Sequence, residues 1–214
     1  MADPNILKAV QAALAGSKER ERKFTQTVDL AINLKNIDLS IPKNRIEDEL
    51  PLPHGRGKSV KIGIFASGDL ATKAKKVADV VIQPQEMGDL AGDKKRFKKL
   101  VNSVDFFLAE APLMPTIGKT LGVVLGPRGK MPRPIPPTAD PAALVEGLKR
   151  TIRLRSKDRR TFHTTVGSED MGAEKVAENV EVVIKRVESR LEQGRNNIHS
   201  IFVKTTMGPA SKVV

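Results

Sequence analysis

Apolar positions at the start of the chain recur at the spacing of a helix. Four apolar residues between Ile6 and Leu14 fall on one helical face. Asp3 is a suitable N-cap, Pro4 suits the first turn, and Gly16 can end a helix. The pattern predicts an amphipathic helix over residues 3–16.

Further along the chain the period changes to two. From Thr25 to Lys35 apolar residues alternate with polar ones, and residues 161–166 and 198–207 alternate in the same way. This alternation predicts half-buried strands, each with one polar face. Between the last two strands, apolar residues at helical spacing predict a long helix over residues 173–193, with Gly194 as its C-cap.

The middle of the chain has a different pattern, in which short apolar strands alternate with helices. Because strands that alternate with helices are joined by crossovers, we expect a mainly parallel sheet. Residues 126–137 form a Gly/Pro/Arg-rich loop. A further strand is expected near Leu50, before this region begins. The expected strands are residues 61–66, 80–82 and 104–109, and the expected helices are residues 70–77, 94–101 and 141–152.

The two ends of the chain therefore resemble each other, and the middle does not. We expect a fold of the α/β and α+β classes with two domains. Residues 1–59 and 154–214 would form a discontinuous α+β domain, into which an α/β domain of residues 60–153 is inserted.

The net charge of the chain indicates what kind of partner it binds. The formal net charge is +12 and the pI is about 10.0, so the chain should attract RNA, DNA or an anionic membrane. No apolar run approaches the roughly 18 residues of a membrane span. Residues 58–153 hold 17 Lys and Arg against 9 Asp and Glu, so charge alone favours the insert as the nucleic-acid contact.

Enzyme chemistry finds little support. Gly129-Lys130 resembles a phosphate loop, but Val124 stands where that motif needs Gly, and Met131 replaces its Ser or Thr. The chain has no Cys, which excludes disulfides and thiolate sites, and its three His show no metal-ligand spacing. We expect no catalytic residue, no metal and no cofactor.

RNA-binding chemistry is better represented, although each element also has an ordinary structural explanation. Residues 205–209 end a strand with small hydroxyls and a Gly, which let an RNA backbone approach, or they simply form a turn. Phe24 beside Lys23 places an aromatic ring at an RNA surface, or fills the core. The polar strand faces and the cations of residues 126–130 and 153–160 suit phosphate and sugar contacts, or are merely solvated.

Four segments together resemble the archaeal branch of the large-subunit ribosomal protein L-one family. They are residues 22–28, 42–58, 121–132 and 204–211, the last of which contains Thr-Thr-Met-Gly-Pro. The resemblance implies a split α+β sandwich domain with an inserted Rossmann-like domain. It also implies a cytoplasmic ribosomal protein that binds the rRNA of the mobile stalk near the tRNA exit site. Family members assist release of deacylated tRNA and repress translation of their own mRNA, which carries an rRNA-like site.

The resemblance also implies where RNA binds, namely on the split domain. The family's principal contact corresponds to Phe24, Thr205, Thr206, Met207 and Gly208. The insert would supply a weaker second RNA contact. The less certain neighbours of the principal contact are Lys23, Thr25, Thr27, His163, Thr165 and Lys204, and the candidates for the second contact are Arg128 and Lys130.

Two other function classes make different predictions. A nucleotide-dependent enzyme built on the insert would bind ATP or NAD saturably at the strand ends. A general chromatin-type basic protein would bind any nucleic acid, and salt would abolish that binding. The missing phosphate motif argues against the first class, and the long ordered core argues against the second.

Overall fold

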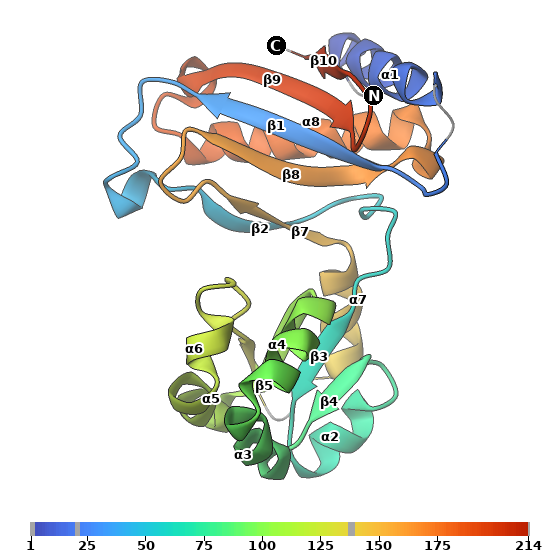
Figure 1. Cartoon of the computed structure of the whole chain (residues 1–214). Coiled ribbons are helices and arrows are strands. Elements are labelled where there is room, and N and C mark those ends of the chain that lie inside the picture. The colour runs from blue at the N-terminus through green and yellow to red at the C-terminus, as the bar shows by residue number, and fades with distance from the viewer. Residues whose placement is uncertain (1–2, 20–21, 137–139, 214) are drawn as a thin grey trace. The chain divides into compact units, whose positions relative to one another are not determined.

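The computed structural model describes residues 3–19, 22–136 and 140–213. The chain forms two compact units (Figure 1). Met1–Lys58 and Arg150–Val214 make up the first, here called the split unit, and Ser59–Lys149 make up the second, the inserted unit. Of the expected elements, the end of the Gly/Pro/Arg-rich loop at residue 137 lies outside the described residues.

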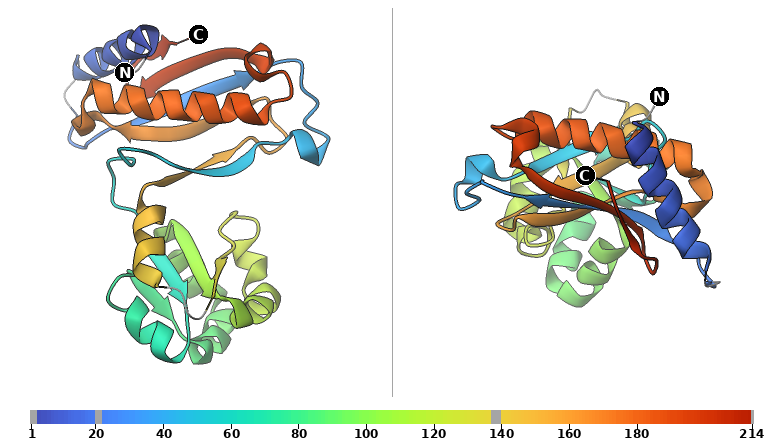
Figure 2. Two further views of the ribbon diagram at one scale, coloured as in Figure 1. Left: turned by 180° about the vertical axis from the view of Figure 1, so that it is seen from behind. Right: turned by 90° about the horizontal axis from the view of Figure 1, so that it is seen from above.

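The split unit is built on an antiparallel sheet with the strand order β10-β9-β1-β8. One face of the sheet is covered by helices: α8 lies across it, and α1 packs against α8 and β9 (Figure 2). Alternate residues of β1, from Val28 to Leu34, point into the core beneath these helices. The elements are α1 (Pro4–Lys18), β1 (Thr27–Leu34), β8 (Thr161–Ser168), η3 (Glu169–Met171), α8 (Ala173–Arg190), η4 (Gly194–Asn197), β9 (Ile198–Thr205) and β10 (Ala210–Lys212).

Both helix ends differ from the sequence prediction, because each glycine has another role. Helix α1 continues past Gly16 to Lys18. A Cβ at Gly16 would lie 2.5 Å from Cγ of Pro209, so this glycine permits a close contact with the chain's last turn. Helix α8 ends at Arg190, and Gly194, with φ +54°, begins the following 3₁₀ turn.

A two-stranded ribbon completes the split unit, where the sequence pattern predicted a helix reaching residue 152. Helix α7 (Pro141–Lys149) stops earlier, and β7 (Thr151–Arg155) pairs with β2 (Glu47–Pro51), which follows η1 (Pro42–Asn44). The prediction was wrong because Ile152 and Leu154 alternate as buried residues of the split unit's core. In a strand, residues two positions apart point to the same face, so Ile152 and Leu154 both enter the core.

The inserted unit contains the expected parallel sheet, with the strand order β4-β3-β5-β6. Its strands are β3 (Ile62–Phe65), β4 (Val80–Ile82), β5 (Phe106–Glu110) and β6 (Arg133–Ile135). Alternate strand residues feed two apolar clusters on opposite faces, one containing Phe65 and Phe107, the other Ile64 and Phe106. The Rossmann-like, mixed α/β fold class is thus confirmed.

Helices cover both faces of this sheet (Figures 1 and 2). Three helices were not predicted, namely α3, α5 and α6, and β6 lies within the segment predicted as a loop. The segments of α5 and α6 contain Gly and Pro, which mask their helical spacing. The helices are α2 (Gly68–Ala74), α3 (Pro84–Gly92), α4 (Lys94–Ser103), the 3₁₀ turn η2 (Ala111–Leu113), α5 (Met114–Thr120), α6 (Gly122–Leu125) and α7.

Candidate nucleic-acid interface

The turn between β9 and β10 is held against the start of β1. Thr206 donates its backbone N–H to the Thr27 carbonyl at 3.1 Å, and its hydroxyl lies 3.3 Å from both that carbonyl oxygen and the Thr27 nitrogen. Gly208 N–H closes the turn on the Thr205 carbonyl at 3.3 Å. Two segments that lie 179 residues apart in sequence thereby form one surface.

Gln26 anchors this turn from within. Its side chain is 2% exposed, and its Oε1 accepts the Met207 N–H at 3.0 Å. Its Nε2 donates to Ser17 Oγ at 2.5 Å and to Glu169 Oε2 at 3.3 Å, while its own backbone N–H donates to Glu169 Oε1 at 2.7 Å. A single residue therefore joins β1, α1, η3 and the turn, and the sequence prediction missed it. A polar residue with the parity of the buried face was the signal.

Two apolar side chains are exposed at this surface. Phe24 is 52% exposed and Met207 is 58% exposed, so the aromatic ring does not fill the core. Both belong to the segments that the Gln26 network joins, and Lys23 and Thr25 are exposed beside them. Exposed apolar groups flanked by polar ones are typical of interaction sites.

Thr205 differs from its predicted neighbours. Its side chain is fully buried, and its hydroxyl has no hydrogen-bond partner among the residues that the structure describes. A Cβ added at Gly208 would lie 2.2 Å from the Thr205 Oγ1 atom. Thr205 thus supports the turn from beneath, in place of the direct contact expected from the sequence, and Gly208 is required by the space available.

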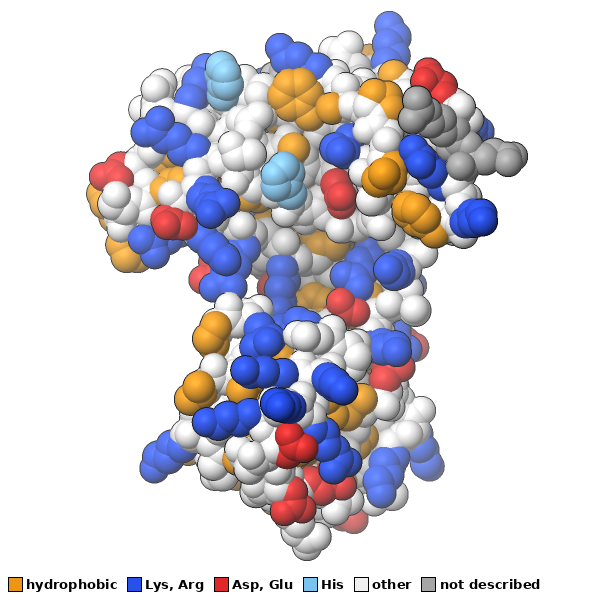
Figure 3. Space-filling view, in the orientation of Figure 1, with side chains coloured by type: hydrophobic (Ala, Val, Ile, Leu, Met, Phe, Trp, Pro, Cys, Tyr) orange, Lys and Arg blue, Asp and Glu red, His pale blue; other side chains and the backbone are white. Residues whose placement is uncertain are grey.

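The open sheet face beside this turn is polar. Cross-strand register aligns Thr165, Asp29 and Lys204 in one row, and His163 and Phe202 flank Ala31 in the next. In Figure 3 this face shows His and uncharged polar surface together with some apolar and basic side chains, and few acidic groups. His163 is exposed, whereas Thr27, Thr165 and Lys204 are half-buried. The structure therefore brings these predicted residues onto one face.

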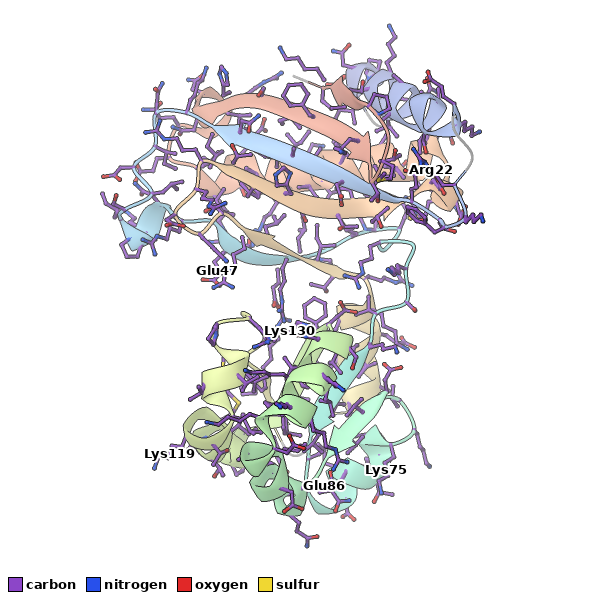
Figure 4. The ribbon with its side chains drawn as sticks, in the orientation of Figure 1. Arg22, Glu47, Lys75, Glu86, Lys119 and Lys130 are labelled. Atoms are coloured by element: carbon purple, nitrogen blue, oxygen red, sulfur yellow. The ribbon has the colours of Figure 1, made fainter. Side chains whose placement is uncertain are left out.

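Some polar groups of this face already have partners. The Thr165 hydroxyl donates to Asp29 Oδ1 at 3.1 Å, and the Thr161 hydroxyl donates to Asn33 Oδ1 at 2.8 Å. These bonds hold the two threonine side chains against β1. Arg22 extends from the segment that precedes β1 and adds a positive charge at the edge near the turn (Figure 4).

The predicted cations of residues 153–160 lie at the end of β7 and in the loop before β8, and two of them already form ion pairs. Arg153 pairs with Glu49 at 3.0 Å and Arg155 with Glu47 at 3.3 Å, both across the β2–β7 ribbon. These two guanidinium groups stabilise the ribbon. The remaining cations of that segment include Lys157, which is exposed in the loop before β8.

Arg128 and Lys130, the predicted second contact, have structural partners in the inserted unit. The Lys130 ammonium donates to the carbonyls of Val101 at 2.7 Å and Val104 at 2.5 Å, so it caps the C-terminal end of α4 (labelled in Figure 4). Arg128 donates to Asn102 Oδ1 at 3.1 Å. Both side chains are half-buried, which leaves little of either cation for a phosphate.

The place where open α/β sheets bind phosphates is filled by the protein itself. Strands β3 and β5 are neighbours from which the chain runs in opposite directions across the sheet. At their C-terminal ends, Glu110 Oε2 accepts the Ser67 N–H at 3.1 Å and the Ser67 hydroxyl at 2.6 Å. A carboxylate in this position repels an incoming phosphate, which argues against the nucleotide-dependent enzyme.

The three histidines lie apart in the structure. His54 contacts Glu178 at 2.5 Å, and this hydrogen bond holds the pKa of the Glu178 carboxyl below its usual value. His163 and His199 are exposed on different strands. Within residues 3–19, 22–136 and 140–213, no three His, Asp or Glu side chains gather as metal ligands would.

In the same ranges, every helix is too short or too polar to cross a membrane.

Comparison with known proteins finds relatives that match along the whole chain. Residues 14–209 match the family described as "Ribosomal protein L1p/L10e family". A protein of Methanocella arvoryzae named "Large ribosomal subunit protein uL1" is 54% identical over the full length of both chains. Proteins with the same name from Archaeoglobus fulgidus and Thermoplasma acidophilum are 51% and 53% identical, covering 98% and 95% of this chain and 97% and 95% of their own.

Proposed function

Since the chain belongs to the Ribosomal protein L1p/L10e family, we propose that its split unit binds the rRNA of the mobile stalk near the tRNA exit site. As a member of this family the chain is a structural constituent of the large ribosomal subunit and is not an enzyme. The RNA binds on a defined surface of the split unit, and we propose two further activities for the protein, repression of its own mRNA and assistance in tRNA release.

One observation carries the choice of surface: a buried amide network joins a glycine turn to the segment before β1, and each of these two segments carries an exposed apolar side chain. Met207 and Phe24 offer apolar contacts to a ribose or base, and Thr206 offers a hydroxyl. Gly208 lets the turn close on Thr205. RNA is recognised through shape and 2′-hydroxyl contacts more than through groove readout, so a surface of this kind suits a folded RNA.

Stalk binding is tested with the full chain against a stalk rRNA fragment and an unrelated structured RNA, across a salt series. We expect a preference for the stalk that persists at high salt. Thr206→Ala removes the hydroxyl that bonds to Thr27, and it should weaken stalk binding by about tenfold, or about 1.4 kcal/mol. Thr116→Ala, an exposed change on α5, is the matched control.

Equal binding to both RNAs, with a steep salt slope and no effect of Thr206→Ala, would reject this assignment and favour the chromatin-type class. Loss of binding in both variants would point to a general defect. A Thr206→Ala protein with an unchanged melting temperature and weaker stalk binding would support a direct role of the turn.

We further propose that the same surface binds the protein's own mRNA at an rRNA-like site and represses its translation. Two RNAs that use one surface must compete, so added stalk rRNA should relieve repression in a cell-free translation system. Thr206→Ala should repress less, in proportion to its loss of stalk affinity. Repression that an excess of stalk rRNA leaves unchanged would separate the two activities.

Assistance in the release of deacylated tRNA is the third part of the proposal, and it rests on the resemblance alone. Ribosomes reconstituted without the protein should release tRNA from the exit site more slowly than complete ribosomes. Adding back the wild-type chain should restore the rate. An unchanged rate in the depleted ribosomes would remove this part of the proposal while leaving stalk binding intact.

A further inference from the structure

Helix α4 of the inserted unit exposes a dense group of cations. Its side chains at positions 94–96, 98 and 99 are all Lys or Arg and all exposed. The ion pairs found among the described residues involve none of these five. Figure 3 shows Lys and Arg side chains gathered over the part of the inserted unit where Figure 1 places α4. We call these five residues the α4 cations.

These charges oppose the stability of the helix that carries them. Lys94, Lys95 and Arg96 occupy the first turn, where the helix dipole already places positive charge, and beyond the N-cap carboxylate that turn holds no acidic residue. Lys94 and Lys98 lie four residues apart, and like charges at that spacing repel each other. By contrast, Lys130 caps the other end of α4, where a cation is favourable. Folding therefore does not account for the α4 cations.

The buried side of α4 limits what can bind to the exposed side. Phe97 and Val101 are fully buried in the unit's core, so the helix has no free apolar face with which to enter a membrane. The unit's remaining aromatic side chains, Phe65, Phe106 and Phe107, are buried as well, and the chain has no Trp or Tyr. Bases of a single strand would have no ring on which to stack.

We propose that the α4 cations form a second RNA-binding surface, which contacts the phosphate backbone of double-helical RNA without reading its sequence. Phosphate contacts of this kind release counterions and give a steep salt dependence. The surface belongs to a different unit from the Thr206 turn, and it takes the role that the sequence suggested for Arg128 and Lys130. It does not depend on which RNA the split unit recognises.

The test uses the full chain with Lys94→Gln, Lys95→Gln, Lys98→Gln and Lys99→Gln combined. The matched control neutralises four exposed lysines on α2, its end and α5, namely Lys73, Lys75, Lys76 and Lys119, so net charge and unit are the same. Figure 4 labels Lys75 and Lys119. The probes are an RNA duplex of about 20 base pairs and arbitrary sequence, a single strand of equal length, and vesicles containing anionic lipid.

We expect the α4 variant to bind the duplex at least about tenfold more weakly at roughly 0.1 M salt, with a slope of log K against log salt reduced by about 2 to 4. The control should change affinity by less than about threefold. The α4 variant should also melt about 1–3 °C higher, because like-charge repulsion is removed. The preference for stalk rRNA over an unrelated RNA should remain, since the Thr206 turn is untouched.

Equal losses in the two variants would overturn the proposal, because net charge alone would then explain binding. A larger loss for the single strand than for the duplex would overturn the choice of double-helical RNA. Vesicle binding that requires the α4 cations, with duplex binding unchanged, would assign the surface to membranes. Loss of stalk preference in Thr206→Ala alone would concern the proposed function and leave this surface unaffected.

Discussion

At the residue scale, the candidate interface depends on a few contacts that admit little change. Gln26 makes five hydrogen bonds from a position that is almost completely buried, and Gly208 lies against the Thr205 hydroxyl. Removing the partner of a buried polar group costs the full desolvation energy of that group. Substitutions at these two positions should therefore affect both folding and RNA binding.

Gln26→Ala removes the amide that joins the turn to Ser17 and Glu169. We expect the free energy of unfolding to fall by about 2–3 kcal/mol, because buried polar groups lose their partner. Stalk binding should weaken as well, since the Met207 N–H loses its acceptor. Chemical denaturation and a binding titration measure the two effects. Gln11→Ala, on the exposed side of α1, is the control and should change neither.

Gly208→Ala places a methyl group where the Thr205 hydroxyl already lies. We expect a loss of about 1–3 kcal/mol in unfolding free energy, because a well-packed site resists added volume. Thr205→Ala in the same chain should recover much of this loss, since it removes the atom that clashes. A double-mutant cycle measured by denaturation gives the coupling. Strictly additive effects would show that the turn relaxes by another route.

At the element scale, one carboxylate of the β2–β7 ribbon binds two arginines of α8, in addition to the apolar core that the ribbon and helix share. Asp48 on β2 accepts hydrogen bonds from Arg186 at 2.5 Å and Arg190 at 3.1 Å. Burial raises the pKa of the Asp48 carboxyl, but the two arginines together lower it by more, so the net pKa lies below the usual value. The ionised form is therefore part of what holds this ribbon to the helix.

The pKa of Asp48 predicts how stability responds to acid. Because the folded pKa is below the unfolded one, the ion pairs stabilise the protein fully above about pH 4. That stabilisation should be lost as the pH falls through the folded pKa. Asp48→Asn should lower the unfolding free energy at pH 7 by about 1–3 kcal/mol and flatten this part of the pH profile. Asp158→Asn, an exposed change, should leave the profile unaltered.

At the scale of the whole molecule, the split unit has a hydrophobic core of its own. The two places where the chain passes between the units lie close together. Every residue of the split unit's buried apolar cluster lies before position 53 or after position 151. The chain leaves and re-enters the unit beside the ribbon, where Leu52 N–H donates to the Arg150 carbonyl at 2.9 Å. A short linker can therefore replace the inserted unit without straining the sheet.

Replacing residues 59–149 with a short Gly/Ser linker should give a folded protein. We expect it to keep its preference for the stalk fragment, because the Thr206 turn and the open sheet face remain. The salt slope should become shallower, since the α4 cations are gone. Circular dichroism and binding across a salt series check both points. A folded variant without stalk preference would place specificity in the inserted unit.

Several features of this protein are determined by its sequence alone. Period-two alternation predicted β1, β8 and β9, and helical spacing predicted α1 and α8, because burial on one face imposes its period on the order of residues. The parallel sheet of the insert was predicted correctly for the same reason. Glycine and proline patterns failed at α5, α6 and β6, where packing against neighbours outweighs local propensity.

Only the tertiary structure decided how the candidate site is assembled. The sequence placed Thr206 and Phe24 at two strand ends, but their common surface exists because β9 pairs with β1. The alternation of β9 places Thr205 on the buried face with Ile201 and Val203, but no pattern in the sequence indicated that Lys130 caps a helix. The residues that contact one another in these places lie far apart in the chain. The periodicity of a sequence predicts which face of an element is buried, but it does not predict which other element covers that face.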